Sequence, residues 1–170
     1  MDTVVSHEDI ATGLSYDALV TAFERELGRW EPASGVALAE RRAPWSEVER
    51  EVDRMAGPHG LMIFYRADQG AITSISGRTK RCSLYLVGNP IIANEIIDID
   101  LRAGFYMPFR LCLYDSGASE GASIAFDRPS SFLGLLGRAE LDAIGLMLDQ
   151  KIDAVVDALR ASRGGVGEAR

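Results

Sequence analysis

Three consecutive residues near the middle of the chain, Gly88-Asn89-Pro90, could present backbone amides to a ligand. They follow a short apolar run and precede residues 91–97, which have the pattern of a helix. Free N–H groups at a helix start attract anions and carboxylates, which gives the turn a functional interpretation. The structural interpretation is that glycine allows a positive φ, asparagine caps the helix and proline suits its first position. We favour the structural interpretation and keep Gly88 and Asn89 as candidate ligand-binding residues.

Polar side chains within or at the ends of predicted strands form a second group of candidates. Asp68 and Asp127 each end a strand, and Arg110 lies within one. Strand residues alternate between two faces, so several side chains should share the face that points away from the helices, provided that Leu84 and Leu86 belong to the core. That set is Ser83, Tyr85, Arg110 and Tyr114. A face with two tyrosines and few charges is predicted to be an interface or the floor of a pocket.

The chain lacks the common catalytic and metal-binding patterns. Its two histidines lie in predicted loops and form no convincing Ser-His-Asp set. Neither zinc-ligand spacing nor a Gly-rich phosphate loop with its lysine is recognisable. We therefore expect no metal and no cofactor, and we name no catalytic residue. Cys82 and Cys112 lie in predicted strands and are expected to be buried, free thiols.

Composition excludes several classes of partner. The 170 residues carry a formal net charge of −7, so nucleic acid and anionic membranes are poor candidates. Residues 1–15 do not resemble a signal peptide, and no apolar run approaches the about 18 residues that a membrane helix needs. We expect a cytoplasmic protein that uses neither nucleic acid nor a membrane as its partner.

Hydrophobic periodicity predicts an α+β fold. Four helices are expected, at residues 15–28, 45–55, 90–97 and 139–161. Five strands are expected, at residues 35–42, 61–66, 81–87, 107–114 and 122–126. This order predicts a two-layer sandwich, in which a mainly antiparallel sheet of about five strands has its helices on one face.

The same patterns divide the chain into three parts. Residues 1–34 are predicted to be an N-terminal lead, flexible as far as Leu14, followed by an extra helix. Residues 35–163 form a single α+β domain, and residues 164–170 form a flexible tail. In the last helix, an apolar stripe from Leu141 to Leu159 is expected to lie on the sheet.

An ordered set of segments resembles the bacterial and archaeal family labelled domain of unknown function 302. The matching segments are Gly60 to Asp68, Ala71 to Gly77, Leu84 to Pro90, Pro108 to Tyr114 and Ala122 to Pro129. The chain departs from the family pattern at Asp68-Gln69, where an Asp-His pair is usual. The resemblance covers about residues 35–160. It implies a two-layer α+β sandwich that often pairs as a dimer, and it implies no activity or cofactor.

Two functions remain open on the sequence alone, and they leave undecided whether the protein is an enzyme. The first is a non-catalytic homodimeric module that binds a small ligand or a protein. The second is a small enzyme that uses carboxylate chemistry from Asp68 or Asp127 near Asn89. The sequence shows no general base paired with a nucleophile, which favours the first function. A carboxyl group with a strongly raised pKa in a cleft would favour the second.

Overall fold

The computed structural model describes residues 4–117 and 119–163. The predicted flexible tail, residues 164–170, lies outside these ranges, so it stays a prediction. Among the described residues, no helix combines the length and apolar character needed to cross a membrane. The same ranges hold no cluster of three or more His, Cys, Asp or Glu side chains that could bind a metal ion.

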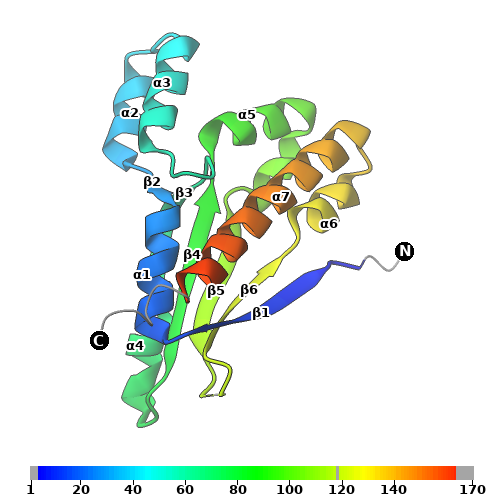
Figure 1. Cartoon of the computed structure of the whole chain (residues 1–170). Coiled ribbons are helices and arrows are strands. Elements are labelled where there is room, and N and C mark those ends of the chain that lie inside the picture. Colours follow the sequence, from blue (N-terminus) through cyan, green and yellow to red (C-terminus); the bar gives the residue numbers. More distant parts are fainter. Residues whose placement is uncertain (1–3, 118, 164–170) are drawn as a thin grey trace.

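A six-stranded sheet forms the centre of the molecule (Figure 1). In spatial order its strands are β1 (His7–Leu14), β6 (Ala122–Asp127), β5 (Phe109–Asp115), β4 (Arg81–Gly88), β3 (Met62–Asp68) and β2 (Gly28–Arg29). Every neighbouring pair is antiparallel except β2 and β3, which run parallel. The predicted α+β class with a mainly antiparallel sheet is therefore confirmed.

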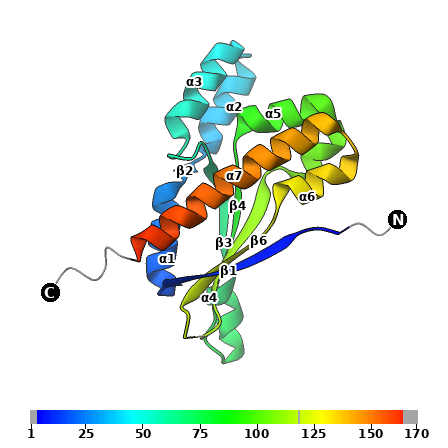
Figure 2. The same ribbon diagram turned by 45° about the vertical axis from the view of Figure 1, so that its right-hand side comes forward.

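The helices gather on one face of the sheet and at its ends. In chain order they are α1 (Tyr16–Glu26), α2 (Pro32–Glu40), α3 (Trp45–Met55), α4 (Gln69–Thr73), α5 (Pro90–Ile99), α6 (Pro129–Leu133) and α7 (Ala139–Ser162). Short 3₁₀ helices η1 (Ser74–Ser76), η2 (Leu101–Tyr106) and η3 (Gly134–Leu136) follow α4, α5 and α6. Figures 1 and 2 show α7 crossing the sheet with α1 beside it. The opposite side of the sheet is called the open face below.

Two elements differ from the sequence-based expectation. Residues 35–42 were expected to form a strand, but they lie mostly in α2, where Pro32 occupies the first turn and Leu38 alone is buried. The alternation of Val36 and Leu38 suggested a strand, although the intervening alanines suit a helix better. The expected flexible lead contains β1, which pairs with β6 as an edge strand. Two of its inward residues, Glu8 and Thr12, are polar, so the apolar signal in the sequence is weak.

The main core lies between the sheet and the two helices α1 and α7. The α7 stripe faces the sheet as predicted, with Leu141, Leu148, Ile152, Val155, Val156 and Leu159 all buried. Gly145 lets α6 approach α7, because a Cβ there would stand 2.6 Å from the Cα of Ser130. The Ser130 side chain and amide both donate to Asp149, which fixes this contact.

A second, smaller hydrophobic cluster lies under the helical hairpin formed by α2 and α3. Its buried members are Val52, Met55 and Met62, with Trp30, Val48, Ala56, Phe64 and Ile91 packed around them. In Figure 1 the hairpin stands beyond the end of the sheet, next to α5. The hairpin and the first turn of α5 therefore meet at the end of β4, where the sequence had suggested a site.

Candidate functional site

Asn89 joins β4 to α5 and uses its whole side chain in doing so. The side-chain Oδ1 accepts hydrogen bonds from the amides of Ile91 and Ile92, at 2.8 and 3.4 Å. The Nδ2 group donates to the carbonyl oxygen of Gly60 at 2.9 Å. The asparagine therefore occupies the first free N–H groups of the helix, which are the groups an anion would need. This geometry supports the structural role of the turn.

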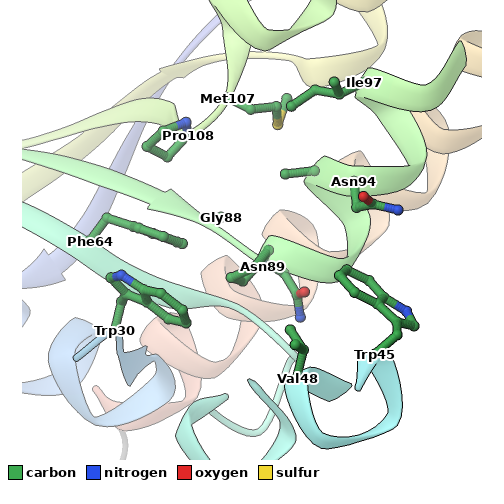
Figure 3. A pocket seen from close by; sticks show the side chains of 12 residues that line it. Trp30, Trp45, Val48, Phe64, Gly88, Asn89, Asn94, Ile97, Met107 and Pro108 are labelled. Carbon is green, nitrogen blue, oxygen red and sulfur yellow. The ribbon is translucent and has the colours of Figure 1, made fainter. Parts of the chain in front are cut away.

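Next to Asn89 lies a cavity of about 400 Å³, a size typical of small-molecule sites. Its lining comes from the hairpin, the sheet end, α5 and the segment that enters β5. The lining residues are Trp30, Trp45, Val48, Phe64, Gly88, Asn89, Pro90, Ala93, Asn94, Ile97, Met107 and Pro108. Figure 3 shows these side chains around the cavity, which we call the Asn89 pocket. None of them is ionisable, so the pocket suits an uncharged ligand.

Aromatic side chains give the Asn89 pocket a flat wall. The rings of Trp30 and Phe64 stack with centroids 5.5 Å apart and planes inclined by 24°. Trp45 is 46% exposed and lines the same pocket from α3. Such walls offer large apolar contact area with little loss of side-chain freedom on binding.

Gly88 keeps the floor of the pocket open. It is absent from the glycines with positive φ, so the conformational freedom expected of it is not used. A Cβ built at Gly88 would lie 3.4 Å from Pro108 Cβ and 3.6 Å from Phe64 Cε2. A glycine at this position therefore leaves space between two walls of the pocket, and it is not needed for an unusual backbone angle.

The two candidate carboxylates lie away from the pocket. Met62 pairs with Gly88 and Asp68 pairs with Ser83, so Asp68 is at the far end of β3, about 17 Å from the turn. Its Oδ1 accepts from the Ala71 amide and caps α4. Asp127 lies on the open face, 2.8 Å from His7 Nδ1. The structure does not bring either carboxylate together with Asn89.

Two of the predicted outward residues do lie on the open face. Arg110 and Tyr114 alternate with the buried residues of β5, as the period-two pattern predicted. The hydroxyl of Tyr114 donates to both oxygens of Asp9 at 2.7 Å. That hydrogen bond to a carboxylate raises the pKa of Tyr114. Arg110 makes no ion pair within residues 4–117 and 119–163.

The other two predictions for this face, Ser83 and Tyr85, are wrong. Both side chains are fully buried and point toward α1. Tyr85 donates to Glu24 Oε1 at 2.9 Å, and burial raises the pKa of its hydroxyl. The oxygen atoms of Ser83 and Tyr16 lie 2.8 Å apart. Because α1 supplies partners for these polar atoms, they can be buried, and β4 turns Leu84 and Leu86 to the open face instead.

The family model described as "Domain of unknown function DUF302" matches residues 38–159. The chain belongs to this family. A solved DUF302 structure from Bacillus stearothermophilus, described as an uncharacterised conserved protein, aligns with a TM-score of 0.62 at 13% identity. The alignment covers 91% of this chain and 98% of that chain, and it shows a shared fold. No protein of curated function matches the chain.

Most of the Asn89 pocket lies inside the matched DUF302 region, and Trp30 lies before it. The sequence predicted the turn but not the apolar residues that face it. Within its own segment, each of these residues has the pattern of a core residue. One signal was available: the chain has only two tryptophans, and both line this DUF302 pocket.

Proposed function

We propose that this DUF302 domain is a non-catalytic module that binds a small, uncharged, largely apolar ligand in the Asn89 pocket. The observation that carries the proposal is the lining itself, which has three aromatic side chains and no ionisable group around about 400 Å³. A pocket of this kind gains affinity by burying apolar surface. Because the side chain of Asn89 is engaged in the turn, the amide of Asn94 would orient the ligand.

The lining disfavours the alternative of carboxylate catalysis. General acid–base chemistry needs a titratable side chain within hydrogen-bond reach of the substrate. In the described part of the chain, the pocket offers none, and Asp68 stabilises a helix start at the other end of its strand. Binding without chemistry therefore accounts for this site better than catalysis.

Intrinsic fluorescence gives a direct test, since both tryptophans of the chain line the pocket. We expect the neutral dye N-phenyl-1-naphthylamine to change tryptophan emission in a saturable way. The sulfonated dye 8-anilino-1-naphthalenesulfonate should bind more weakly, because its charge would be desolvated against an apolar wall. Equal binding of both dyes would contradict a pocket selective for uncharged ligands.

A matched pair of variants locates the dye. Ala93→Leu adds a side chain into the pocket and should weaken binding about tenfold or more. Glu95→Leu adds a similar side chain at an exposed position of the same helix, outside the lining, and should leave the affinity unchanged. Equal effects of the two substitutions would place the dye elsewhere.

We also propose that the open face pairs with the same face of a second copy of the chain. Leu84 and Leu86 face outward there, which makes the face more apolar than the sequence suggested. Arg110 lacks an ion-pair partner among the described residues, and the carboxylates of Asp127 and Asp9 lie on β6 and β1, the next two strands of the sheet. Two-fold pairing would cover the leucines and could join the arginine to an acidic residue of the other copy.

Light scattering tests the dimer. We expect about twice the chain mass of 18.5 kDa at micromolar concentration. Leu86→Glu should shift the protein toward monomer, whereas Val36→Glu, at an exposed position of α2, should not. A wild-type protein that stays monomeric at high concentration would refute the pairing.

A further inference from the structure

The two cysteines of the chain meet on the open face. Cys82 lies on β4 and Cys112 on β5, and their Sγ atoms are 3.4 Å apart. In the register, Cys82 pairs with Tyr114 and Cys112 with Leu84, so the thiols lie on a diagonal of one sheet face. Both are free, and both are half-buried rather than buried as the sequence suggested. Their separation by 30 positions in the sequence hid this proximity.

The two thiols have different surroundings. Cys82 is near the start of β4, next to the exposed Arg81, and it donates to Gln69 Oε1 at 3.6 Å. Cys112 lies further inside the sheet, where burial and the neighbouring Cys82 raise its pKa to about 12. A thiol with so high a pKa is a poor nucleophile at neutral pH. The first reaction with an oxidant therefore belongs to Cys82.

We propose that Cys82 and Cys112 are a redox-modification site that forms a reversible disulfide when the protein meets hydrogen peroxide. Cys82 first attacks one peroxide oxygen, the O–O bond breaks, and the products are a sulfenic acid and water. The sulfur of Cys112 then attacks Cys82 Sγ. The S–S bond forms as the S–O bond breaks, and hydroxide leaves with the proton of Cys112 as a second water. Two thiols are oxidised by two electrons, and the peroxide is reduced to two waters.

The second step needs little movement, because Cys112 already lies in hydrogen-bond contact with Cys82. The two sulfurs then need to approach by about 1.4 Å to reach bonding distance, and no change of strand pairing is required.

The position on a diagonal explains why the bond is reversible. Diagonal neighbours in antiparallel sheets have Cα atoms about 7–8 Å apart, whereas disulfides prefer less than about 6.8 Å. A bond formed beyond this range requires a small movement of the backbone and is strained, so it is more easily reduced than a structural disulfide. The site is independent of the Asn89 pocket, and it needs only that a molecule as small as peroxide reaches Cys82 at the margin of the face.

Intact-mass spectrometry after mild peroxide treatment tests this site. The wild-type protein should lose about 2 Da, lose both iodoacetamide-reactive thiols and regain them with a thiol reductant. Cys112→Ser should trap the sulfenic acid of Cys82, which dimedone labels. Cys82→Ser should leave Cys112 unoxidised under the same conditions.

Three outcomes would overturn the proposal. They are oxidation of the wild type to sulfinic acid without a cross-link, disulfides between chains on a non-reducing gel, and no reaction of either thiol. Circular dichroism of both serine variants would establish that they fold, and Cys82→Ala provides a second check with an apolar side chain. Loss of dye binding in the Asn89 pocket would leave this test unaffected, because the two sites share no residue.

Discussion

The main core and the hairpin cluster are two hydrophobic regions of unequal size. Beneath α1 and α7, the main core draws buried residues from five strands and extends along the whole of α7. Beneath α2 and α3, the second cluster has three buried residues, namely Val52, Met55 and Met62. Removing side-chain contacts from a large, closely packed core lowers the stability of the fold. A small cluster leaves space between the elements that surround it. The Asn89 pocket lies where the small cluster meets α5 and the sheet end.

This comparison separates residues that hold the fold from residues that shape the pocket. Trp30, Val48 and Phe64 belong to the edge of the small cluster and also line the cavity. Substitutions in the main core should therefore affect unfolding most. Substitutions in the small cluster should affect ligand binding more than their cost in stability suggests.

The largest expected effect is in the main core, at Ile152 on α7, which is 1% exposed. Ile152→Ala should lower the free energy of unfolding by about 2–5 kcal/mol, because it leaves a cavity against the sheet. Chemical denaturation measures this loss. A change below about 1 kcal/mol would show that the α7 stripe is not the principal core.

The next effect is in the hairpin cluster, at Val52. Val52→Ala should lower the free energy of unfolding by less, about 1–3 kcal/mol. It removes fewer carbon atoms than Ile152→Ala does, and it removes them from a smaller cluster. It should also weaken dye binding, since α3 carries Trp45 and Val48 of the pocket wall. Val36→Ala on the exposed side of α2 is the control and should change neither quantity. Unchanged dye affinity in Val52→Ala would break the link between this cluster and the pocket.

A smaller effect on stability, with a clear effect on binding, is expected at Gly88. Gly88→Ala should change the unfolding free energy by less than about 1 kcal/mol, because the new Cβ makes ordinary contacts and glycine is itself unfavourable in a strand. The methyl group would occupy space between Pro108 and Phe64, so dye affinity should fall. A stable variant with wild-type affinity would show that the ligand does not reach the pocket floor.

The smallest effect lies outside both clusters, at Asp100, whose side chain is 11% exposed and pairs with the exposed Arg102. Its hydrogen bonds with Arg102 lower the pKa of Asp100 from 3.8 to about 2. A lowered carboxyl pKa stabilises the fold above the unfolded-state value, and this contribution disappears as the pH falls through about 2. Carboxyl-carbon NMR of the wild type should give a midpoint near 2, and Arg102→Gln should move it up. Identical midpoints in the two proteins would exclude the pairing.

The sequence predicted the fold class, because α7, β5 and β6 have clear periodicity. On β5 and β6 the apolar residues alternate with polar ones, which fixes the buried face. On β4 the residues from Leu84 to Val87 are all apolar or aromatic, so either face fits the core. The choice depends on Glu24, which accepts from Tyr85 across 61 residues of sequence.

The candidate site could be predicted only in part, for the same reason. The turn at Asn89 has a local signature, since asparagine and proline at a helix start are recognisable in any sequence. The pocket walls come from residues spread between Trp30 and Pro108, and each has a plain explanation within its own element. Their convergence depends on how the hairpin packs beside α5, and the sequence has no local signal for that packing.

The crystal structure of the protein soaked with N-phenyl-1-naphthylamine tests the central claim most directly. The account predicts ordered density for the dye in the Asn89 pocket, in contact with Phe64 and with Ala93 and Ile97 of α5. Density on the open face, beside Leu84 and Leu86, or an empty pocket at a dye concentration that saturates the fluorescence change, would contradict it.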